Sequence, residues 1–160
     1  MPAGSGRRPP VLADILLVLS TLEKYRVEYV LLGGAAMAFH GFPRMTRDID
    51  CLFPRDAANN SRLLKALAAL GKQVRLDYLP EKRSLDRGFS TAAEGEIALD
   101  ILFVAASKGF DDYRAHIEER EIDGVRIKVL DVDGMLESKE TGRPEDIPDR
   151  MRLATLKRPR

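Results

Sequence analysis

Asp48 and Asp50 are separated by one residue, in a segment (residues 48–53) that the sequence predicts to be a β-strand. Because side chains alternate between the faces of a strand, both carboxylates point the same way, while Ile49 and Cys51 point the other way. Two neighbouring carboxylates raise each other's pKa unless a cation compensates their charge. Mg²⁺ takes one or two carboxylates, keeps several waters and binds substrate phosphates. The pair therefore indicates a Mg²⁺ site.

A third aspartate, Asp100, lies in a later predicted strand with the same facial pattern, residues 97–103. One face of this strand is wholly apolar, with Ile97, Leu99, Ile101 and Phe103. An acid on the other face of a buried strand is costly unless it is compensated. We therefore expect Asp100 to lie beside Asp48 and Asp50, as the third carboxylate of one cluster.

A glycine pair, Gly33 and Gly34, follows a short apolar strand (residues 28–32) and precedes a small-residue helix (residues 35–39). The first N–H groups of a helix have no backbone partner and lie at the positive end of its dipole, so they bind phosphate readily. Glycine pairs are also ordinary turns, and this one lacks the third glycine of the dinucleotide-binding fingerprint. Taken alone, the pair favours the turn; beside the aspartates it indicates phosphate binding.

The glycine pair, the two aspartates about a dozen residues later and the distant third acid resemble the nucleotidyltransferase superfamily typified by DNA polymerase beta. The resemblance covers most of residues 28–103. Further motifs are similar to those of small bacterial nucleotidyltransferases related to abortive-infection toxins. They are Arg44-x-Thr46-Arg47-Asp48-x-Asp50, Leu136-x-x-Lys139 and Gly142-Arg143-Pro144-x-Asp146. Aminoglycoside and lincosamide nucleotidyltransferases share the same core.

The resemblance implies a role for the glycine pair and for each of the three aspartates. Backbone amides of Gly33 and Gly34 hold the β- and γ-phosphates of a nucleoside triphosphate. Asp48 and Asp50 hold two Mg²⁺ ions, which Mn²⁺ can replace, and Asp100 completes the acceptor-side metal and takes the proton from the attacking hydroxyl.

Four more residues are candidates for nucleotide binding: Arg44, Thr46, Arg47 and Lys139. Cationic side chains supply charge to phosphates. The alternatives are a solvated basic turn for the two arginines and an exposed helical lysine for Lys139. Thr46 has the alternatives of orienting Asp48 or bonding its own turn.

The resulting hypothesis is a Mg²⁺-dependent nucleotidyltransferase. It moves a nucleoside monophosphate from NTP to a hydroxyl of RNA such as tRNA, of a protein or of a small molecule. It is a candidate toxin of a toxin–antitoxin pair, with an antitoxin or a second copy of itself as partner. One alternative is a non-catalytic nucleotide-binding or protein-interaction module with the same fold, and another is a metal-dependent phosphohydrolase.

Other residues with chemical potential have simpler explanations. Asp131 and Asp133 form a second Asp-x-Asp, but a helix follows them, so capping explains them better. His40 is interpreted as a structural contact within its short helix, and Cys51 as a small buried residue. With one cysteine and two histidines, the chain has neither a disulfide framework nor a Cys/His zinc spacing. A reducing, cytoplasmic setting and no membrane contact are expected.

The fold expected from these patterns is α+β, with a mixed sheet of about four to six strands, helices mainly on one face, and short C-terminal helices. The chain has 160 residues and a net charge of +1, which suits one domain. We expect a flexible lead-in at residues 1–10 and a single domain at 11–160. The remaining predicted helices are 11–25, 57–70, 110–119, 133–140 and 145–157. The remaining predicted strands are 73–79, 89–92 and a pair ending at 130, and residues 80–88 are predicted to be a loop.

Overall fold

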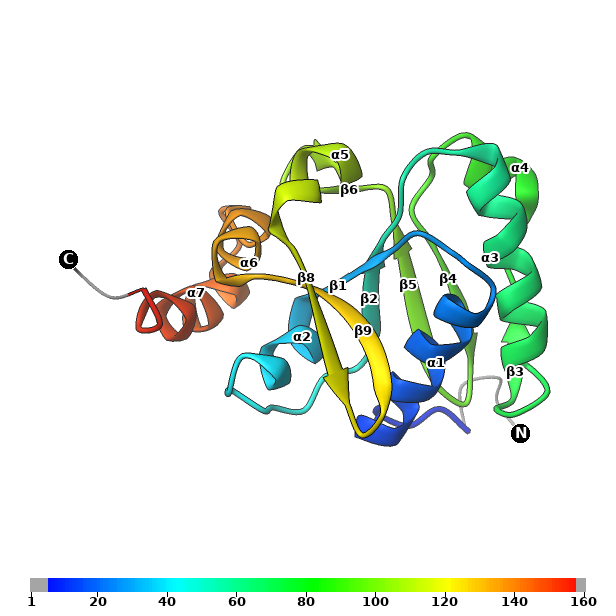
Figure 1. Cartoon of the computed structure of the whole chain (residues 1–160), viewed down its shortest axis with the longest axis horizontal. Helices are drawn as coiled ribbons and strands as arrows, with labels where there is room; N and C mark the ends of the chain where they lie inside the picture. Colours follow the sequence, from blue (N-terminus) through cyan, green and yellow to red (C-terminus); the bar gives the residue numbers. More distant parts are fainter. Residues whose placement is uncertain (1–5, 158–160) are drawn as a thin grey trace.

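Seven strands form one mixed sheet in the computed structural model, which describes residues 6–157 (Figure 1). Across the sheet they are ordered β3 (Leu76–Tyr78), β4 (Thr91–Gly95), β5 (Ala98–Leu102), β2 (Ile49–Leu52), β1 (Val30–Leu32), β9 (Val125–Leu130) and β8 (Ile117–Ile122). β2 pairs in parallel with β5, and β1 with β9, while the other neighbours are antiparallel. The α+β class with a mixed sheet is confirmed.

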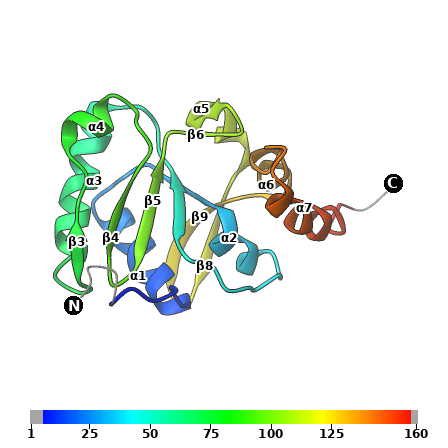
Figure 2. The same cartoon turned by 180° about the vertical axis from the view of Figure 1, so that it is seen from behind.

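Two long helices, α1 (Leu12–Lys24) and α3 (Ala57–Leu70), pack against each other and against one face of the sheet. α1 lies in front of the sheet in Figure 1 and behind it in Figure 2. Their apolar stripes meet the inward faces of β2 and β5, where Ile49, Cys51 and Ile101 are fully buried. The opposite face of these two strands carries the aspartates.

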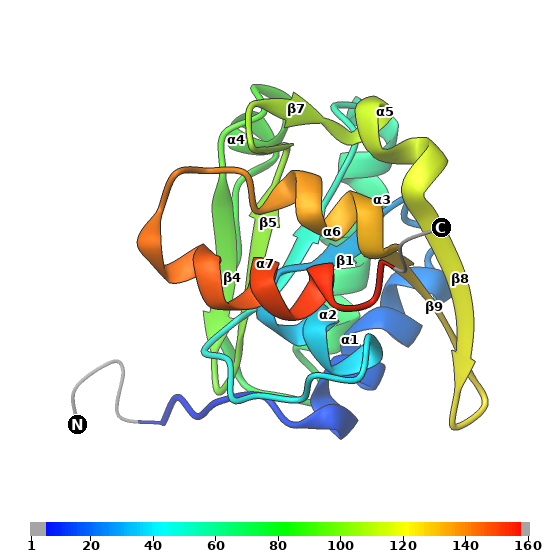
Figure 3. The same cartoon turned by 90° about the vertical axis from the view of Figure 1, so that its left-hand side faces the viewer.

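The remaining helices are short. They are α2 (Gly33–Phe39), α4 (Lys82–Asp86), α5 (Phe110–Tyr113), α6 (Val132–Ser138) and α7 (Ile147–Ala154), with 3₁₀ turns η1 (Arg114–His116) and η2 (Pro144–Asp146). α6 and α7 contact each other at the end of the molecule away from α3 and α4 (Figures 1 and 3). Among residues 6–157, no helix is long and apolar enough to cross a membrane.

The predicted loop at residues 80–88 is wrong, because it contains α4. Its polar composition hid one anchor, Leu85, which is fully buried against α3. Asn60 of α3 donates to Asp86, and Lys82 pairs with Asp86 one turn away. One buried leucine and two polar ties are enough to hold this short helix.

The predicted helix at residues 110–119 is also wrong beyond its first turn. α5 ends at Tyr113, η1 follows, and the chain becomes β8 at Ile117. β8 pairs antiparallel with β9 along its whole length, from Ile117 opposite Leu130 to Ile122 opposite Val125. This ladder overrides the helical spacing of the apolar residues and extends the first strand of the predicted pair back to Ile117. The sheet has seven strands, above the expected four to six.

The first described residues of the chain are tied to the sheet and to α1. Arg8 donates to both carboxylate oxygens of Asp14, at 2.6 and 2.8 Å, and its backbone N–H donates to the Glu96 carbonyl. Residues 1–5 of the expected lead-in, and the basic tail at 158–160, lie outside the described part of the chain. The division into a lead-in and a single domain stays a prediction.

Candidate active site

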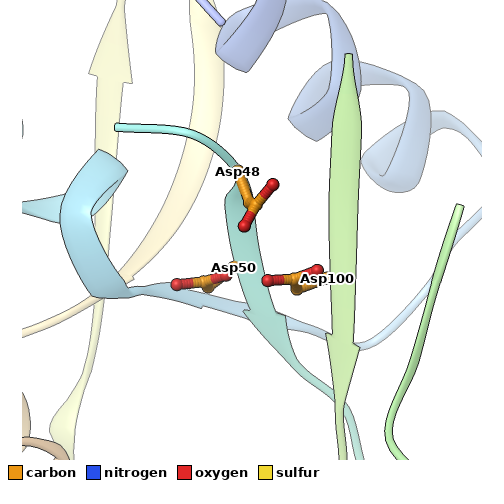
Figure 4. Close-up of side chains that lie close together, drawn as sticks. All are labelled: Asp48, Asp50 and Asp100. Atoms are coloured by element: carbon orange, nitrogen blue, oxygen red, sulfur yellow. The ribbon is translucent and has the colours of Figure 1, made fainter. Parts of the chain in front are cut away.

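Asp48, Asp50 and Asp100 lie together on the sheet face opposite α1 and α3 (Figure 4). Asp50 of β2 and Asp100 of β5 are direct neighbours in the parallel ladder, and Asp48 immediately precedes β2. One carboxylate oxygen from each lies within 4.8 Å of the others. The expected proximity of Asp100 to the pair is confirmed.

The three carboxylates destabilise one another's charge. Burial and the Asp100 charge raise the pKa of Asp48, and burial is the main cause of the raised pKa of Asp50. Burial, together with a hydrogen bond to Asp50 and its charge, raises the pKa of Asp100 to about 7. Three neighbouring acids whose pKa values are all raised are held charged together most readily by a bound cation.

The donor set fits a divalent cation. It consists of carboxylate oxygens only, which are the ligands that Mg²⁺ and Mn²⁺ prefer. The wall beside Asp50 is Gly33, where a Cβ atom would lie 2.2 Å from Asp50 Oδ2. A side chain at Gly33 would therefore fill the space next to the cluster.

Each glycine of the pair occupies a position that disfavours a side chain. Gly33 has φ +72°, a conformation that side chains disfavour, and it turns β1 directly into α2. A Cβ atom at Gly34 would lie 2.7 Å from Thr46 Oγ1. The residue before α2 is Leu32, whose apolar side chain cannot bond the amides of the first turn. The pair thus brings open backbone N–H groups close to Asp50, as the resemblance implies.

The basic turn between α2 and β2 divides into three kinds of residue. Arg44 donates from Nε and Nη2 to both carboxylate oxygens of Asp149, at 3.2 and 2.8 Å. Thr46 Oγ1 donates to the Asp48 carbonyl at 3.1 Å, which fits the alternative that it orders this turn. Arg47 is exposed at the pocket and makes no ion pair within residues 6–157.

Lys139, at the end of α6, is only 6 % exposed, so the alternative of an exposed helical lysine is wrong. Its Nζ lies 2.9 Å from Asp149 Oδ2 and 3.9 Å from Asp146 Oδ1. Arg143 also donates to Asp146, at 3.0 Å. We call these five residues, Arg44, Lys139, Arg143, Asp146 and Asp149, the ion network.

Asp149 was not among the predicted site residues, and Asp146 only as part of a motif. A sequence signal for both existed. Asp146, Asp149 and Leu153 follow the helical spacing of one face, and all three are buried. Two acids in line with the apolar residue that anchors a helix require cations beside them, and these are the buried Lys139 and the exposed Arg44.

All nine predicted site residues line one pocket of about 870 Å³ between the sheet, α2 and the α6–α7 segment. They are Gly33, Gly34, Arg44, Thr46, Arg47, Asp48, Asp50, Asp100 and Lys139. The pocket has an acidic centre and a basic rim, to which Arg143 and Arg152 add further charge. The roles of these residues in binding and catalysis stay predictions.

The residues given simpler explanations behave accordingly. Asp131 caps α6 by accepting from the Gly134 N–H at 2.7 Å. His40 is buried, with Nε2 at 2.7 Å from the Leu130 carbonyl oxygen. Cys51 is fully buried on the face opposite the aspartates.

Comparison with known proteins gives a family match. The model of the aminoglycoside-2''-adenylyltransferase family matches residues 14–146, whereas no curated protein matches the chain. Several solved structures share the fold. The lincosamide antibiotic adenylyltransferase LnuA, with lincomycin bound, has a TM-score of 0.63 at 17 % identity, over 94 % of this chain and 100 % of its own.

Two further structures are similar at the same level. The antibiotic-resistance factor ANT(2'')-Ia has a TM-score of 0.58 at 19 % identity, over 90 % of this chain and 83 % of its own. An antigenic nucleotidyltransferase-like protein from Paracoccidioides brasiliensis has a TM-score of 0.58 at 18 % identity, over 96 % and 81 %. At these identities the structures establish the fold. The closer similarity to abortive-infection toxins stays a prediction.

Proposed function

Because the chain belongs to the aminoglycoside-2''-adenylyltransferase family, we propose that it transfers a nucleoside monophosphate from NTP to a hydroxyl acceptor, with the help of Mg²⁺ or Mn²⁺. The observation that carries the proposal is the cluster of Asp48, Asp50 and Asp100 in the same pocket as the glycine pair. A carboxylate triad next to open helix amides suits a substrate that is a metal-bound polyphosphate.

The carboxylates of Asp48, Asp50 and Asp100 would hold the cation. When bound, the cation supplies charge that neutralises the phosphates and the departing pyrophosphate. The amides of Gly33 and Gly34 bind the β- and γ-phosphates, and the rim arginine Arg47 adds charge to the same end of the nucleotide.

The position of Asp100 between two pockets supports a role for it in activating the acceptor. Asp100 lines the large pocket and also a second pocket of about 500 Å³ that includes Tyr78, Thr91 and Glu94. A carboxylate oxygen of Asp100 takes the proton of the acceptor hydroxyl as the hydroxyl oxygen bonds to the α-phosphorus. The bond from the α-phosphorus to the oxygen bridging it to the β-phosphorus breaks, and pyrophosphate leaves.

The second pocket supports a small-molecule acceptor. Its volume suits one drug-sized molecule, and Glu94 and Asp100 favour a cationic, hydroxyl-bearing one. The family name points to aminoglycosides, and LnuA was solved with lincomycin. Small-molecule antibiotics of these two classes are therefore the first acceptors to test, followed by tRNA and protein.

The direct test is incubation of the purified protein with Mg²⁺, each α-labelled NTP and each acceptor, followed by measurement of labelled product and pyrophosphate. We expect labelled acceptor in equal amount to pyrophosphate. Absence of both NTP binding and labelled product would refute the proposal. Release of free nucleoside monophosphate without an acceptor would identify a phosphohydrolase, and binding without pyrophosphate release would identify a non-catalytic nucleotide-binding module.

A toxin role is a narrower proposal, in which the acceptor is a cellular RNA or protein and an antitoxin or a second copy is the partner. Its support is the similarity of the motifs around Arg44 and Lys139 to those of abortive-infection toxins. Expression in a bacterial host tests it. Growth arrest that disappears with Asp48→Asn would support a toxin, whereas unimpaired growth with an active enzyme would refute it.

A further inference from the structure

A smaller pocket adjoins the acidic cluster on the side away from the basic turn. It has a volume of about 200 Å³ and shares Gly33, Asp50, Lys139, Arg143 and Asp146 with the large pocket. Its other walls are Leu32 and Leu102 of the sheet, the tip of the hairpin formed by β6 (Val104–Ala105) and β7 (Lys108–Gly109), and the end of α6. Figure 3 shows α6 and β7 from the side. We call it the hairpin pocket.

The two pockets lie toward opposite ends of β2 and β5, the strands that carry Asp50 and Asp100. The large pocket contains Arg47 and Asp48, which precede β2. The hairpin pocket instead contains Leu102, which ends β5 and is paired with the last residue of β2. Because β2 and β5 are parallel, Asp50 and its neighbour Asp100 stand between the two pockets.

The chemical linings of the two pockets differ. Arg44, Arg47 and Arg152 line only the large pocket. The side chains that line the hairpin pocket but not the large one carry no charge: Leu32 and Leu102 from the sheet, Val104, Ala105 and Ala106 from the hairpin, and Ser138 and Thr141 near the end of α6. On this side the shared Arg143 is already bound to Asp146 and Thr141.

A nucleoside triphosphate is likewise highly charged at one end and much less polar at the other. The α-phosphorus must lie at the carboxylates for transfer, so the rest of the triphosphate extends to one side of Asp50 and the nucleoside to the other. The arginines of the large pocket attract the polyanionic end. The uncharged hairpin side of the smaller pocket suits the flat face of a heterocyclic base, and the pocket's volume is below the ~300–1,000 Å³ of whole-ligand sites.

We propose that the hairpin pocket is the nucleoside subsite, binding the base and ribose of the NTP between the β6–β7 hairpin and the end of α6. The inference rests on the proposed function, because it assigns the part of that substrate which the phosphate site does not hold.

The hairpin is held as a fixed wall. Tyr113 OH donates to the Ala105 carbonyl at 2.7 Å, and Lys108 of β7 pairs with Glu137 of α6. The turn between its strands consists of Ala106 and Ser107, with φ of +49° and +66°. Such residues adopt a left-handed turn only when surrounding contacts impose it, and the two ties supply those contacts.

The turn offers a matched pair of substitutions. Ala106 lines the hairpin pocket, whereas Ser107, the next residue, is exposed and lines neither pocket. Both residues are left-handed, so leucine imposes a similar backbone strain at each. Ala106→Leu fills the pocket, and Ser107→Leu adds the same side chain at the neighbouring exposed position.

The test is calorimetric binding of the four NTPs and of inorganic tripolyphosphate, each with Mg²⁺. We expect Ala106→Leu to weaken NTP binding at least about tenfold, the effect of misfit groups in an apolar pocket, with tripolyphosphate binding unchanged. Ser107→Leu should alter neither. If Ala106→Leu does not fold, Val104→Phe narrows the same pocket from β6, where Val104 is 54 % exposed, and should show the same pattern.

Each result has a distinct meaning. NTP affinity unchanged in Ala106→Leu or Val104→Phe, or an equal loss of tripolyphosphate binding, would overturn the subsite. So would wild-type protein that binds tripolyphosphate as tightly as NTP, although the phosphate site would then stand. Wild-type protein that binds neither probe would refute the proposed function itself.

Discussion

Two groups of aspartates share one pocket, and their surroundings treat them in opposite ways. Asp146 and Asp149 of the ion network are 6 % and 3 % exposed. Burial favours the neutral form of Asp149, but hydrogen bonds from Arg44 and Lys139 outweigh it and lower its pKa. In the acidic cluster, Asp48, Asp50 and Asp100 face mainly one another, and the pKa of each is raised.

The difference separates structural from functional acids. An acid whose charge is satisfied by neighbouring cations stabilises the fold, and in this protein it fixes the α6–α7 segment to the basic turn. Acids that lie together without neighbouring cations lower the stability of the fold. Such an arrangement is typical of a site that binds a ligand. The two groups should therefore respond oppositely to substitution, metal and pH.

The largest expected effect is on transfer. Asp48→Asn is nearly isosteric but weakens cation binding, so we expect the rate to fall about 10³-fold, the size seen when one electrostatic contact to a transition state is lost. Labelled-NTP transfer measures it. The control is Asp133→Asn in the second Asp-x-Asp, where Asp133 pairs with Lys157 at the surface. Equal rates in both variants would contradict a catalytic role for Asp48.

The next effect is on stability. Asp149→Ala leaves Lys139 buried with only Asp146 at 3.9 Å, so we expect the free energy of unfolding to fall by about 3 kcal/mol, the cost of breaking a buried ion pair. Urea denaturation measures it. Asp100→Asn is the comparison, because it removes a repelling charge and should leave the metal-free protein as stable or more stable. Equal destabilisation by the two variants would contradict the distinction between the acids.

The sequence predicted the acidic cluster better than the ion network, for a physical reason. Strand periodicity places Asp48 and Asp50 on one face without knowledge of the rest of the fold, and Asp100 stands out as an acid among apolar residues. The partners of Asp149 lie ten residues away at Lys139 and more than a hundred away at Arg44. No local pattern specifies such a meeting.

The same limit explains the two wrong elements of the fold. Residues 117–122 contain three glutamates and an arginine, and only the ladder with β9 makes them a strand. Residues 82–86 have weak helical character, and the burial of Leu85 against α3 decides their structure. Elements with a strong period were predicted, whereas these two depend on pairing or packing with a neighbouring element.

Added Mg²⁺ should stabilise the protein through the acidic cluster alone. At a tenfold excess over its dissociation constant, Mg²⁺ should stabilise the wild-type protein by about 1.4 kcal/mol, because it compensates charges that the fold leaves uncompensated. Thermal unfolding with and without chelator measures the shift. Asp50→Asn should reduce it sharply, whereas Asp133→Asn should keep it. A shift that persists in Asp50→Asn would place the cation elsewhere.

The smallest effect is the pH dependence of stability in the metal-free protein, and its sign differs between the two groups. Burial and the neighbouring Asp50 raise the pKa of Asp100 in the folded protein to about 7, from an ordinary value of 3.8. Between these values the folded state binds more protons, so its contribution to stability falls as pH rises. Asp149 has a lowered pKa, so its contribution is present above pH 3.8 and is lost as pH falls through its folded pKa.

Stability measured in chelator against pH, for the wild-type protein and each variant, separates the two contributions. Asp100→Asn should gain stability relative to wild type as pH rises from 4 to 7, by about 1 kcal/mol or less because solvent screens the partly exposed cluster. The deficit of Asp149→Ala should instead shrink only as the solution becomes more acidic than pH 3.8. Since Arg44 and Lys139 keep their charge throughout this range, a deficit that shrank on the alkaline side would show that Asp149 is not held ionised by them.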